Sequence, residues 1–259
     1  YWNVAHEERP VLAFTPDASF PLVYAEKGIA NFTLVRKFEP GDGLRVAEGR
    51  GGLRPNMVPD SAEVRLVGSV KSVRAACEAM ESYWDANVSA SAAGESLTVR
   101  AIGKSAHGST PQWGDNAVLR LARALHDLHL DAYKDWIDWI VETADPGGSG
   151  LGIEGRDEVA GRLTSNLGVM EFADDTARLT YNVRYPVTWA DGELRSRLDP
   201  VAAKCGWEVT GFNDSRPLHV PLDEEPVKTL LRVYREETGD AETQPETMGG
   251  GTYARATPN

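Results

Sequence analysis

One histidine of this chain, His107, stands in a setting that suits chemistry. It lies in the segment 103–111, Gly-Lys-Ser-Ala-His-Gly-Ser-Thr-Pro, between a predicted strand and a predicted helix. Its small neighbours cannot bury the ring, and Pro111 stiffens the chain beyond it. An exposed imidazole can reach a substrate oxygen and stabilise negative charge that develops there. A purely structural histidine is the alternative that the residues alone leave open.

A carboxylate, Asp17, occupies a second setting of interest. It follows the short apolar run Val11–Phe14, which predicts a strand buried on both faces of a parallel sheet. Open α/β sheets place their ligand sites at the carboxyl ends of such strands. Asp17 is therefore either a ligand-binding carboxylate or an ordinary turn residue beside Pro16.

Three further groups suit the binding of a polar substrate. Arg184, within a predicted strand, is either an outward-facing edge residue or a clamp for a carboxylate. Asn56 and Asn166 are either turn formers or amide ligands. Gly249 to Gly251 lack the lysine of a phosphate-binding loop, so their backbone N–H groups would serve a carboxylate or an oxyanion.

The composition limits the classes of partner. With 259 residues and a formal charge of −12, the chain is poorly suited to bind a nucleic-acid backbone. It has no apolar run near the roughly 20 residues that span a bilayer, and no secretory signal. Two distant cysteines fit a reducing compartment. We therefore expect a cytoplasmic protein without nucleic-acid or membrane partners.

The elements that position these residues fall into two kinds of segment. The middle of the chain, 29–217, predicts an inserted antiparallel α+β domain, beginning with a hairpin of Ala30–Phe38 and Leu44–Glu48. The flanks, 1–28 and 218–259, predict parts of one α/β layer.

Local patterns place the remaining elements of the middle and the last helix. Two strand-helix-strand halves would suit a ferredoxin-like sheet. Strands are expected at 62–68, 95–102, 163–172, 177–185 and 207–212, with a hairpin turn at Asp174-Asp175. Helices are expected after the caps Ser72, Asp115 and Asp191, around Trp136–Ile140, and from Glu225 to Gly239.

Five motifs in this order resemble those of bacterial zinc dipeptidases, the peptidase V and carnosinase-like branch of the aminoacylase and acetylornithine deacetylase family. The motifs have similar gaps in that family, and the resemblance covers essentially the whole chain. They are Phe14–Pro21 followed by Gly28, Asn56–Pro59, Gly103–Pro111, Asn182–Pro186 and Gly249–Arg255.

The resemblance implies an α/β catalytic domain that holds two zinc ions, interrupted by a large lid domain. Cobalt or manganese are alternative metals. A metal-bridging water would hydrolyse a dipeptide with a glutamate as general base. Asp17 would be a zinc ligand and His107 would polarise the scissile carbonyl. Asn56 and Arg184 would hold the substrate, Arg184 at its carboxylate, and Gly249, Gly250, Gly251 and Thr252 would line the pocket.

The resemblance also implies that other parts of the site lie elsewhere. The family's remaining zinc ligands and its general base would precede Tyr1 or follow Asn259. We therefore expect a segment of a longer chain that alone binds no zinc pair and is inactive. The lid at 29–217 exceeds a common domain of roughly 100 residues, which implies a monomer that completes its own site, a dimer being the alternative. The rival functions are an N-acyl amino acid deacylase or carboxypeptidase of the same family, and an inactive binding protein on this fold.

Overall fold

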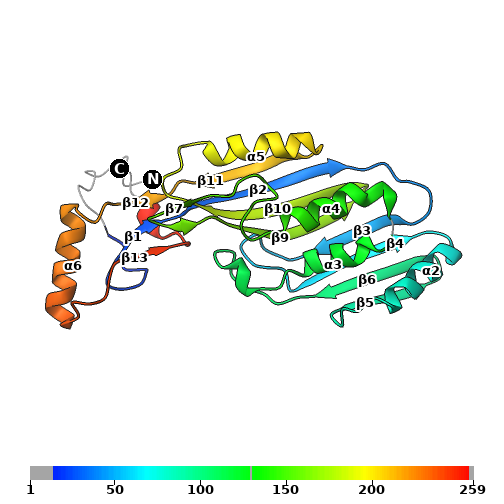
Figure 1. The fold of residues 1–259 in the computed structure, drawn as a ribbon, viewed down its shortest axis with the longest axis horizontal. Coiled ribbons are helices and arrows are strands. Elements are labelled where there is room, and N and C mark those ends of the chain that lie inside the picture. Colours follow the sequence, from blue (N-terminus) through cyan, green and yellow to red (C-terminus); the bar gives the residue numbers. More distant parts are fainter. Residues whose placement is uncertain (1–13, 129, 257–259) are drawn as a thin grey trace, which may run out of the picture.

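The computed structural model describes residues 14–128 and 130–256, which form a mixed α/β structure. Its strands make one eight-stranded sheet, one three-stranded sheet and a two-stranded ribbon of β7 (Arg156–Asp157) and β8 (Gly161–Arg162). Figure 1 shows the large sheet along most of the molecule, with the small sheet at one end. The predicted mixture of helices and antiparallel strands is confirmed. The predicted strand Val11–Phe14 lies, except for Phe14, outside the described residues.

The large sheet is antiparallel between all of its neighbouring strands. Its order is β11-β2-β10-β9-β3-β4-β6-β5. The strands are β2 (Gly28–Lys37), β3 (Arg45–Gly51), β4 (Ser61–Val67), β5 (Val88–Ala93), β6 (Ser96–Ile102), β9 (Thr164–Ala173), β10 (Thr176–Tyr185) and β11 (Glu208–Ser215).

The half of the sheet made of β2, β9, β10 and β11 has ferredoxin-like connectivity. One helix precedes β9 and another joins β10 to β11, and β2 lies between β11 and β10. The hairpin of β9 and β10 turns at Asp174 and Asp175, whose φ values of 50° and 55° suit a two-residue turn with left-handed positions. The predicted hairpin turn is therefore confirmed.

The predicted hairpin of 30–38 with 44–48 is wrong. Both strands exist, as β2 and β3, but they do not pair with each other. β2 pairs with β10 and β11, whereas β3 pairs with β4 and β9. The segment between them carries the chain from one half of the sheet to the other, because β10 and β11 occupy the two places beside β2.

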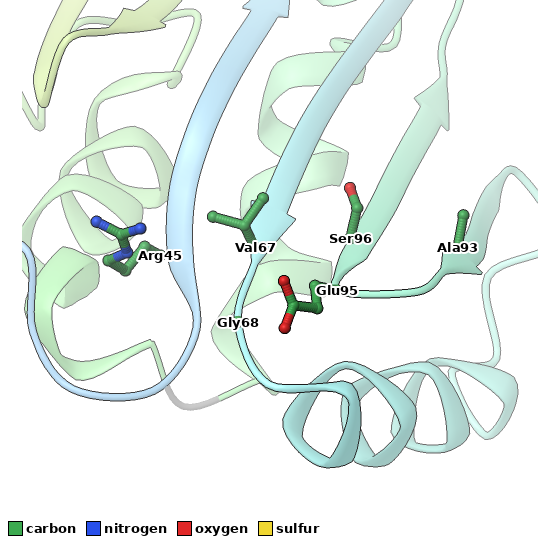
Figure 2. A pocket seen from close by; sticks show the side chains of 6 residues that line it. All are labelled: Arg45, Val67, Gly68, Ala93, Glu95 and Ser96. Carbon is green, nitrogen blue, oxygen red and sulfur yellow. The ribbon is translucent and has the colours of Figure 1, made fainter.

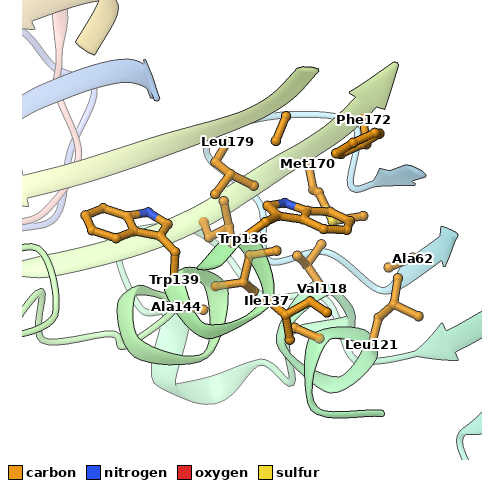
Figure 3. Packing of buried hydrophobic residues seen from close by; sticks show 14 of the residues in the cluster. Ala62, Val118, Leu121, Trp136, Ile137, Trp139, Ala144, Met170, Phe172 and Leu179 are labelled. Carbon is orange, nitrogen blue, oxygen red and sulfur yellow. The ribbon is translucent and has the colours of Figure 1, made fainter. Parts of the chain in front are cut away.

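Four helices, α2 (Val70–Glu81), α3 (Ala117–His126), α4 (Lys134–Thr143) and α5 (Glu193–Lys204), share one hydrophobic core with the large sheet. In Figure 3, Trp136 and Ile137 of α4 and Leu121 of α3 pack against Phe172 and other residues of the sheet. Trp136 and Leu121 are fully buried. None of the helices in the described ranges is long and apolar enough to cross a bilayer.

The three predicted helix caps are each displaced. Ser69, not Ser72, caps α2, and its hydroxyl accepts the Ser72 N–H at 3.1 Å. Asn116 caps α3, while the Asp115 carboxylate pairs with Arg120 instead. Gly192, with φ of 77°, precedes α5. Neighbouring polar residues compete for a cap, and pairing with a nearby arginine removes the carboxylate from that competition.

The small sheet contains β1 (Val23–Glu26), β12 (Leu218–His219) and β13 (Glu246–Met248). β1 lies in the middle, antiparallel to β12 and parallel to β13. α6 (Glu225–Thr238) lies at the same end of the molecule and ends at Gly239, whose φ is 72°. The chain passes between the sheets at Lys27 and again at 216–217.

Candidate functional site

The loop that carries His107 is held by main-chain bonds to the segment around Asn56. His107 and Met57 form an isolated antiparallel bridge. The Val58 N–H donates to the Ala106 carbonyl at 2.9 Å, and the Gly108 N–H donates to the Asn56 carbonyl at 2.8 Å. Two predicted site residues distant in sequence, Asn56 and His107, are thus adjacent in space.

The imidazole of His107 is exposed, and its hydrogen bonds define its tautomer. The Ser109 backbone N–H donates to Nδ1 at 3.2 Å, and the Ser109 hydroxyl lies 2.7 Å from the same nitrogen. Because Nδ1 accepts the backbone bond, a neutral ring carries its proton on Nε2. His107 therefore presents an N–H donor on the side away from its loop.

The protonation of His107 also follows from its surroundings. Partial desolvation lowers the pKa of His107 below its ordinary 6.5, and the positive charge of Arg184 lowers it further. The lowered pKa favours the neutral ring at pH 7. A neutral imidazole can donate a hydrogen bond to an oxygen without transferring its proton to it.

Arg184 is a buried cation at the end of β10. The residue is 5% exposed, and burial lowers the pKa of Arg184 to about 10, with Arg255 adding to the effect. Its Nε donates to the Asn182 side-chain carbonyl at 2.9 Å, and its Nη1 donates to the Gly249 carbonyl at 2.8 Å. Within the described ranges no carboxylate lies at ion-pair distance from it.

A row of asparagines crosses the polar face of the sheet beside Arg184. Asn31, Asn182 and Asn166 are cross-strand neighbours on β2, β10 and β9. The Asn182 amide donates to the Asn31 side-chain oxygen at 2.8 Å, while its own oxygen accepts from Arg184. The row therefore fixes the guanidinium of Arg184 through amide groups that carry no charge.

The sequence leaves Asn56 and Asn166 each as either a turn former or an amide ligand. In the structure, the side chain of Asn166 holds the backbone around Asn56. Its Nδ2 donates to the carbonyls of Pro55 at 2.7 Å and Met57 at 2.9 Å, on both sides of Asn56. The side chain is buried, and its Oδ1 has no partner. Asn166 thus positions the Asn56 segment through its amide nitrogen.

Glycines allow the segments of the site to approach one another. A Cβ at Gly108 would lie 2.9 Å from the Asn182 Oδ1 and 3.1 Å from the Asn56 backbone. A Cβ at Gly249 would lie 3.0 Å from the Ser109 Cβ. The His107 loop therefore packs between the Asn56 segment, the asparagine row and the glycine-rich loop.

The glycine-rich loop itself is fastened to β1. The Thr252 hydroxyl donates to the Glu26 carboxylate at 2.5 Å, and the Thr252 N–H lies 3.2 Å from both of its oxygens. The loop thereby brings Gly249 to Arg184. Four separate segments, carrying Asn56, His107, Arg184 and Gly249, meet at this one place.

Asp17 is not part of that cluster in the structure. It is exposed, and no hydrogen bond links it to the other predicted site residues. The described part of the chain contains no group of three or more His, Cys, Asp or Glu side chains that could hold a metal ion. A lone carboxylate does not make a zinc site, so these residues by themselves do not fit the metal centre that the resemblance implies.

A hollow of about 490 Å³ lies elsewhere and has a different character. Figure 2 shows it at the ends of β4 and β6 that point away from the cluster. Its charged side chains are those of Arg45 and Glu95, and none of the predicted site residues lines it. It brings together fewer polar and charged side chains than the place where Asn56, His107, Arg184 and Gly249 meet.

Two residues that matter here carry no role in the sequence analysis. Glu26 and Arg255 form a buried ion pair with Nε–Oε2 of 2.5 Å, beneath the glycine-rich loop. Arg255 lies in the last of the five motifs, Gly249–Arg255, so the sequence marks its position. The motif does not indicate its ion pair with Glu26. Glu26 follows apolar strand residues and could have been noticed as a charge at the end of a buried strand.

Comparisons with known proteins agree with the dipeptidase resemblance. No family model matches the chain. Over 97% of its length it is 34% identical to "Putative dipeptidase YtjP" of Bacillus subtilis, and over 96% it is 32% identical to "Putative dipeptidase" of Staphylococcus epidermidis. The resemblance to dipeptidases is thus confirmed at the level of sequence.

The matches cover only part of each relative's own length. The chain covers 55% of each of the two proteins, so it spans about half the length of the curated relatives it matches. In structure it is similar to the aminoacylhistidine dipeptidase from Vibrio alginolyticus, with 11% identity and a TM-score of 0.45, covering 91% of this chain and 53% of that one.

Proposed function

We propose that this chain supplies the substrate-binding and carbonyl-polarising part of an enzyme that hydrolyses dipeptides. The observation that carries the proposal is the meeting of Asn56, His107, Arg184 and Gly249 at one place. Similarity to proteins named as putative dipeptidases over nearly the whole chain supports it.

His107 is proposed to stabilise the oxygen of the scissile carbonyl. Its Nε2–H points away from its own loop because Nδ1 is occupied by Ser109. As water attacks, the carbonyl oxygen gains negative charge, and a donor already in place strengthens its bond at that moment. The lowered pKa of His107 keeps this donor in one protonation state near pH 7.

Arg184 is proposed to bind the carboxylate of the dipeptide. Its charge is buried, and in the described part of the chain it is met by an amide oxygen and a backbone carbonyl alone. A buried guanidinium in that state gains more from a carboxylate than an exposed one, since its desolvation is already complete. Asn56 and the Gly249–Thr252 loop would line the same pocket. This arrangement would fix the C-terminal carboxylate of a short peptide.

The zinc part of the site stays a proposal that rests on the resemblance alone. We propose two zinc ions in the full-length protein, with Asp17 among the ligands and the other ligands outside the described residues. Metal-bound water would be the attacking nucleophile in such a site. The roles given to His107 and Arg184 concern the substrate and do not depend on how the metal is held.

The proposed lid corresponds to 29–217, between catalytic-domain parts at 1–28 and 218–259. The extent of the large sheet, β2 to β11, and of the small sheet supports this division. Ser109 and Arg184 from the large-sheet side contact Gly249 within one chain. This contact supports a monomer that completes its own site.

The test is His107→Ala in the full-length protein, assayed on a panel of dipeptides, longer peptides and N-acyl amino acids. Loss of an oxyanion donor lowers kcat on the order of 100- to 1,000-fold. Metal content, measured by elemental analysis, should not change. His126→Ala, on the exposed end of α3, is the matched control.

Two results would contradict the proposal. Equal turnover by His107→Ala and the wild type would remove the histidine from the reaction. A wild-type protein that cleaves acyl amino acids but no dipeptide would assign the substrate to the deacylase alternative.

A further inference from the structure

Arg255 lies where the chain passes between the two sheets. Its Nη1 donates to the Ser215 carbonyl at 3.3 Å, the Ser215 hydroxyl at 3.2 Å and the Arg216 carbonyl at 3.1 Å. Its Nη2 donates to the Lys27 carbonyl. Lys27 joins β1 to β2, and Ser215 and Arg216 lead from β11 toward β12. A single guanidinium therefore bonds to both crossings of the chain.

Arg255 is held in place by a buried carboxylate. Its Nε donates to the Glu26 Oε2 at 2.5 Å, and their side chains are 12% and 3% exposed. Glu26 is the last residue of β1, so the pair is anchored in the small sheet. A pair that is desolvated and hydrogen-bonded on its remaining atoms has one favourable geometry, unlike a surface ion pair.

The same pair reaches the glycine-rich loop. The Nη2 of Arg255 donates to the Gly250 carbonyl at 3.1 Å, and the Glu26 carboxylate accepts from Thr252. The neighbouring Gly249 carbonyl accepts from Arg184 of the large sheet. One set of bonds thus joins both crossings of the chain to this loop.

We propose that Glu26 and Arg255 are positioning residues that lock the hinge between the two sheets and, with it, hold the glycine-rich loop against Arg184. The proposal rests on the proposed function only where it speaks of substrate. The pair does not touch the reacting atoms. It determines whether the two sides of the candidate site face each other at the right distance.

The first experiment measures the hinge directly in the full-length protein, without substrate. Spin labels are placed on exposed Cys205 after α5 and on Lys228→Cys of α6, whose side chain is 53% exposed. Cys77 and any further cysteine are replaced by serine. Pulsed electron resonance should give one narrow distance distribution. Arg255→Lys keeps the positive charge but loses the several N–H donors of the guanidinium that bond to both crossings. Its distance distribution should be about twofold wider.

The control and the second variant separate this effect from general damage. Arg232→Lys changes an exposed arginine that pairs with Glu236 on α6 and should leave the distribution unchanged. If Arg255→Lys does not fold, Glu26→Gln takes its place: it retains one oxygen that can accept from Thr252, and it replaces the charged carboxylate and its second acceptor by an amide. A distribution as narrow as that of the wild type in the folded variant overturns the proposal.

The second experiment asks whether the lock serves the site. Misplacement of substrate-holding groups by about an ångström can cost on the order of 100-fold in rate, so kcat/KM per folded Arg255→Lys molecule should fall by that order. A widened distribution with unchanged kcat/KM overturns the positioning role. If the wild type hydrolyses no dipeptide, the proposed function fails, while the distance measurement still decides whether the hinge is locked.

Discussion

Two arginines flank the glycine-rich loop, Arg184 buried and Arg255 partly buried, and their surroundings differ. Arg255 bonds to the Gly250 carbonyl and its charge is met by Glu26. Arg184 bonds to the neighbouring Gly249 carbonyl, and among the described residues its charge is met by neutral oxygens alone. Burial of a charge costs free energy that a partner must offset. The complete pair therefore suits a structural task, and the unmatched cation suits the capture of an anion.

The largest expected effect concerns the matched arginine. Glu26→Ala leaves Arg255 buried without its carboxylate, and breaking a buried pair in this way costs about 3–5 kcal/mol. We expect the free energy of unfolding, measured by urea denaturation of the full-length protein, to fall by that amount. The double variant Glu26→Ala with Arg255→Met should recover part of the loss. A loss below about 1 kcal/mol, as for exposed ion pairs, would contradict the structural role of the Glu26–Arg255 pair.

The unmatched arginine should show the reverse behaviour. Arg184→Met removes a buried charge, but it also leaves the Asn182 side-chain oxygen and the Gly249 carbonyl without their donor. These two effects oppose each other, so the free energy of unfolding should change by less than in Glu26→Ala. Binding of a dipeptide should weaken by about 2–4 kcal/mol, which raises KM on the order of 30- to 1,000-fold. Arg178→Met, at an exposed position of the same strand, is the control. Loss of stability with unchanged KM would make Arg184 a structural residue like Arg255.

A smaller effect tests the clamp on the Asn56 segment. Asn166→Ala leaves the carbonyls of Pro55 and Met57 without their donor, and each unsatisfied buried group costs about 1–3 kcal/mol. Both stability and kcat/KM should fall together, measured by urea denaturation and dipeptide hydrolysis. Asn213 is an exposed asparagine of β11 that pairs with Asn31, and Asn213→Ala should change neither the free energy of unfolding nor kcat/KM. Equal effects of the two substitutions would contradict the clamp.

The smallest expected effect is on the titration of His107. Its pKa is lowered first by desolvation and second by Arg184, so Arg184→Met should raise the pKa while leaving it below 6.5. A folded pKa below the unfolded one means that stability is lost as the pH falls from 6.5 through the lowered value. Nitrogen-15 NMR of the ring measures the pKa and should show the proton on Nε2. An unchanged pKa would mean that the Arg184 charge is not felt at the ring.

Individual elements were easier to predict than their pairing. The turn at Asp174-Asp175 is local, since two residues with left-handed backbone make it. By contrast, β2 and β3 are adjacent in sequence and separate in the sheet, since β2 finds its partners in β10 and β11. β5 is missing from the sequence prediction because it has only serine and alanine between Val88 and Ala93, and it lacks the large β-branched and aromatic residues that mark a strand.

The candidate site divides in a similar way. The motifs marked Asn56, His107, Arg184 and Gly249, whose roles stay predictions. The contacts between them join segments that are distant in the chain, 65 residues apart for Arg184 and Gly249. The tasks of Asn166 and Glu26 depend on segments more than a hundred residues apart, and no local pattern records such contacts. Spacing along a chain carries little information about which amide meets which carbonyl.

The place of β1 in the small sheet has a consequence for how the chain folds. Its partners, β12 and β13, follow the whole of the large sheet in sequence. During synthesis β1 must wait until that sheet has left the ribosome, and closing so long a loop is slow unless the intervening residues are already compact. We therefore expect the large sheet to form first and to bring the two crossings together, so that β1 meets its partners as a late, nearly local step.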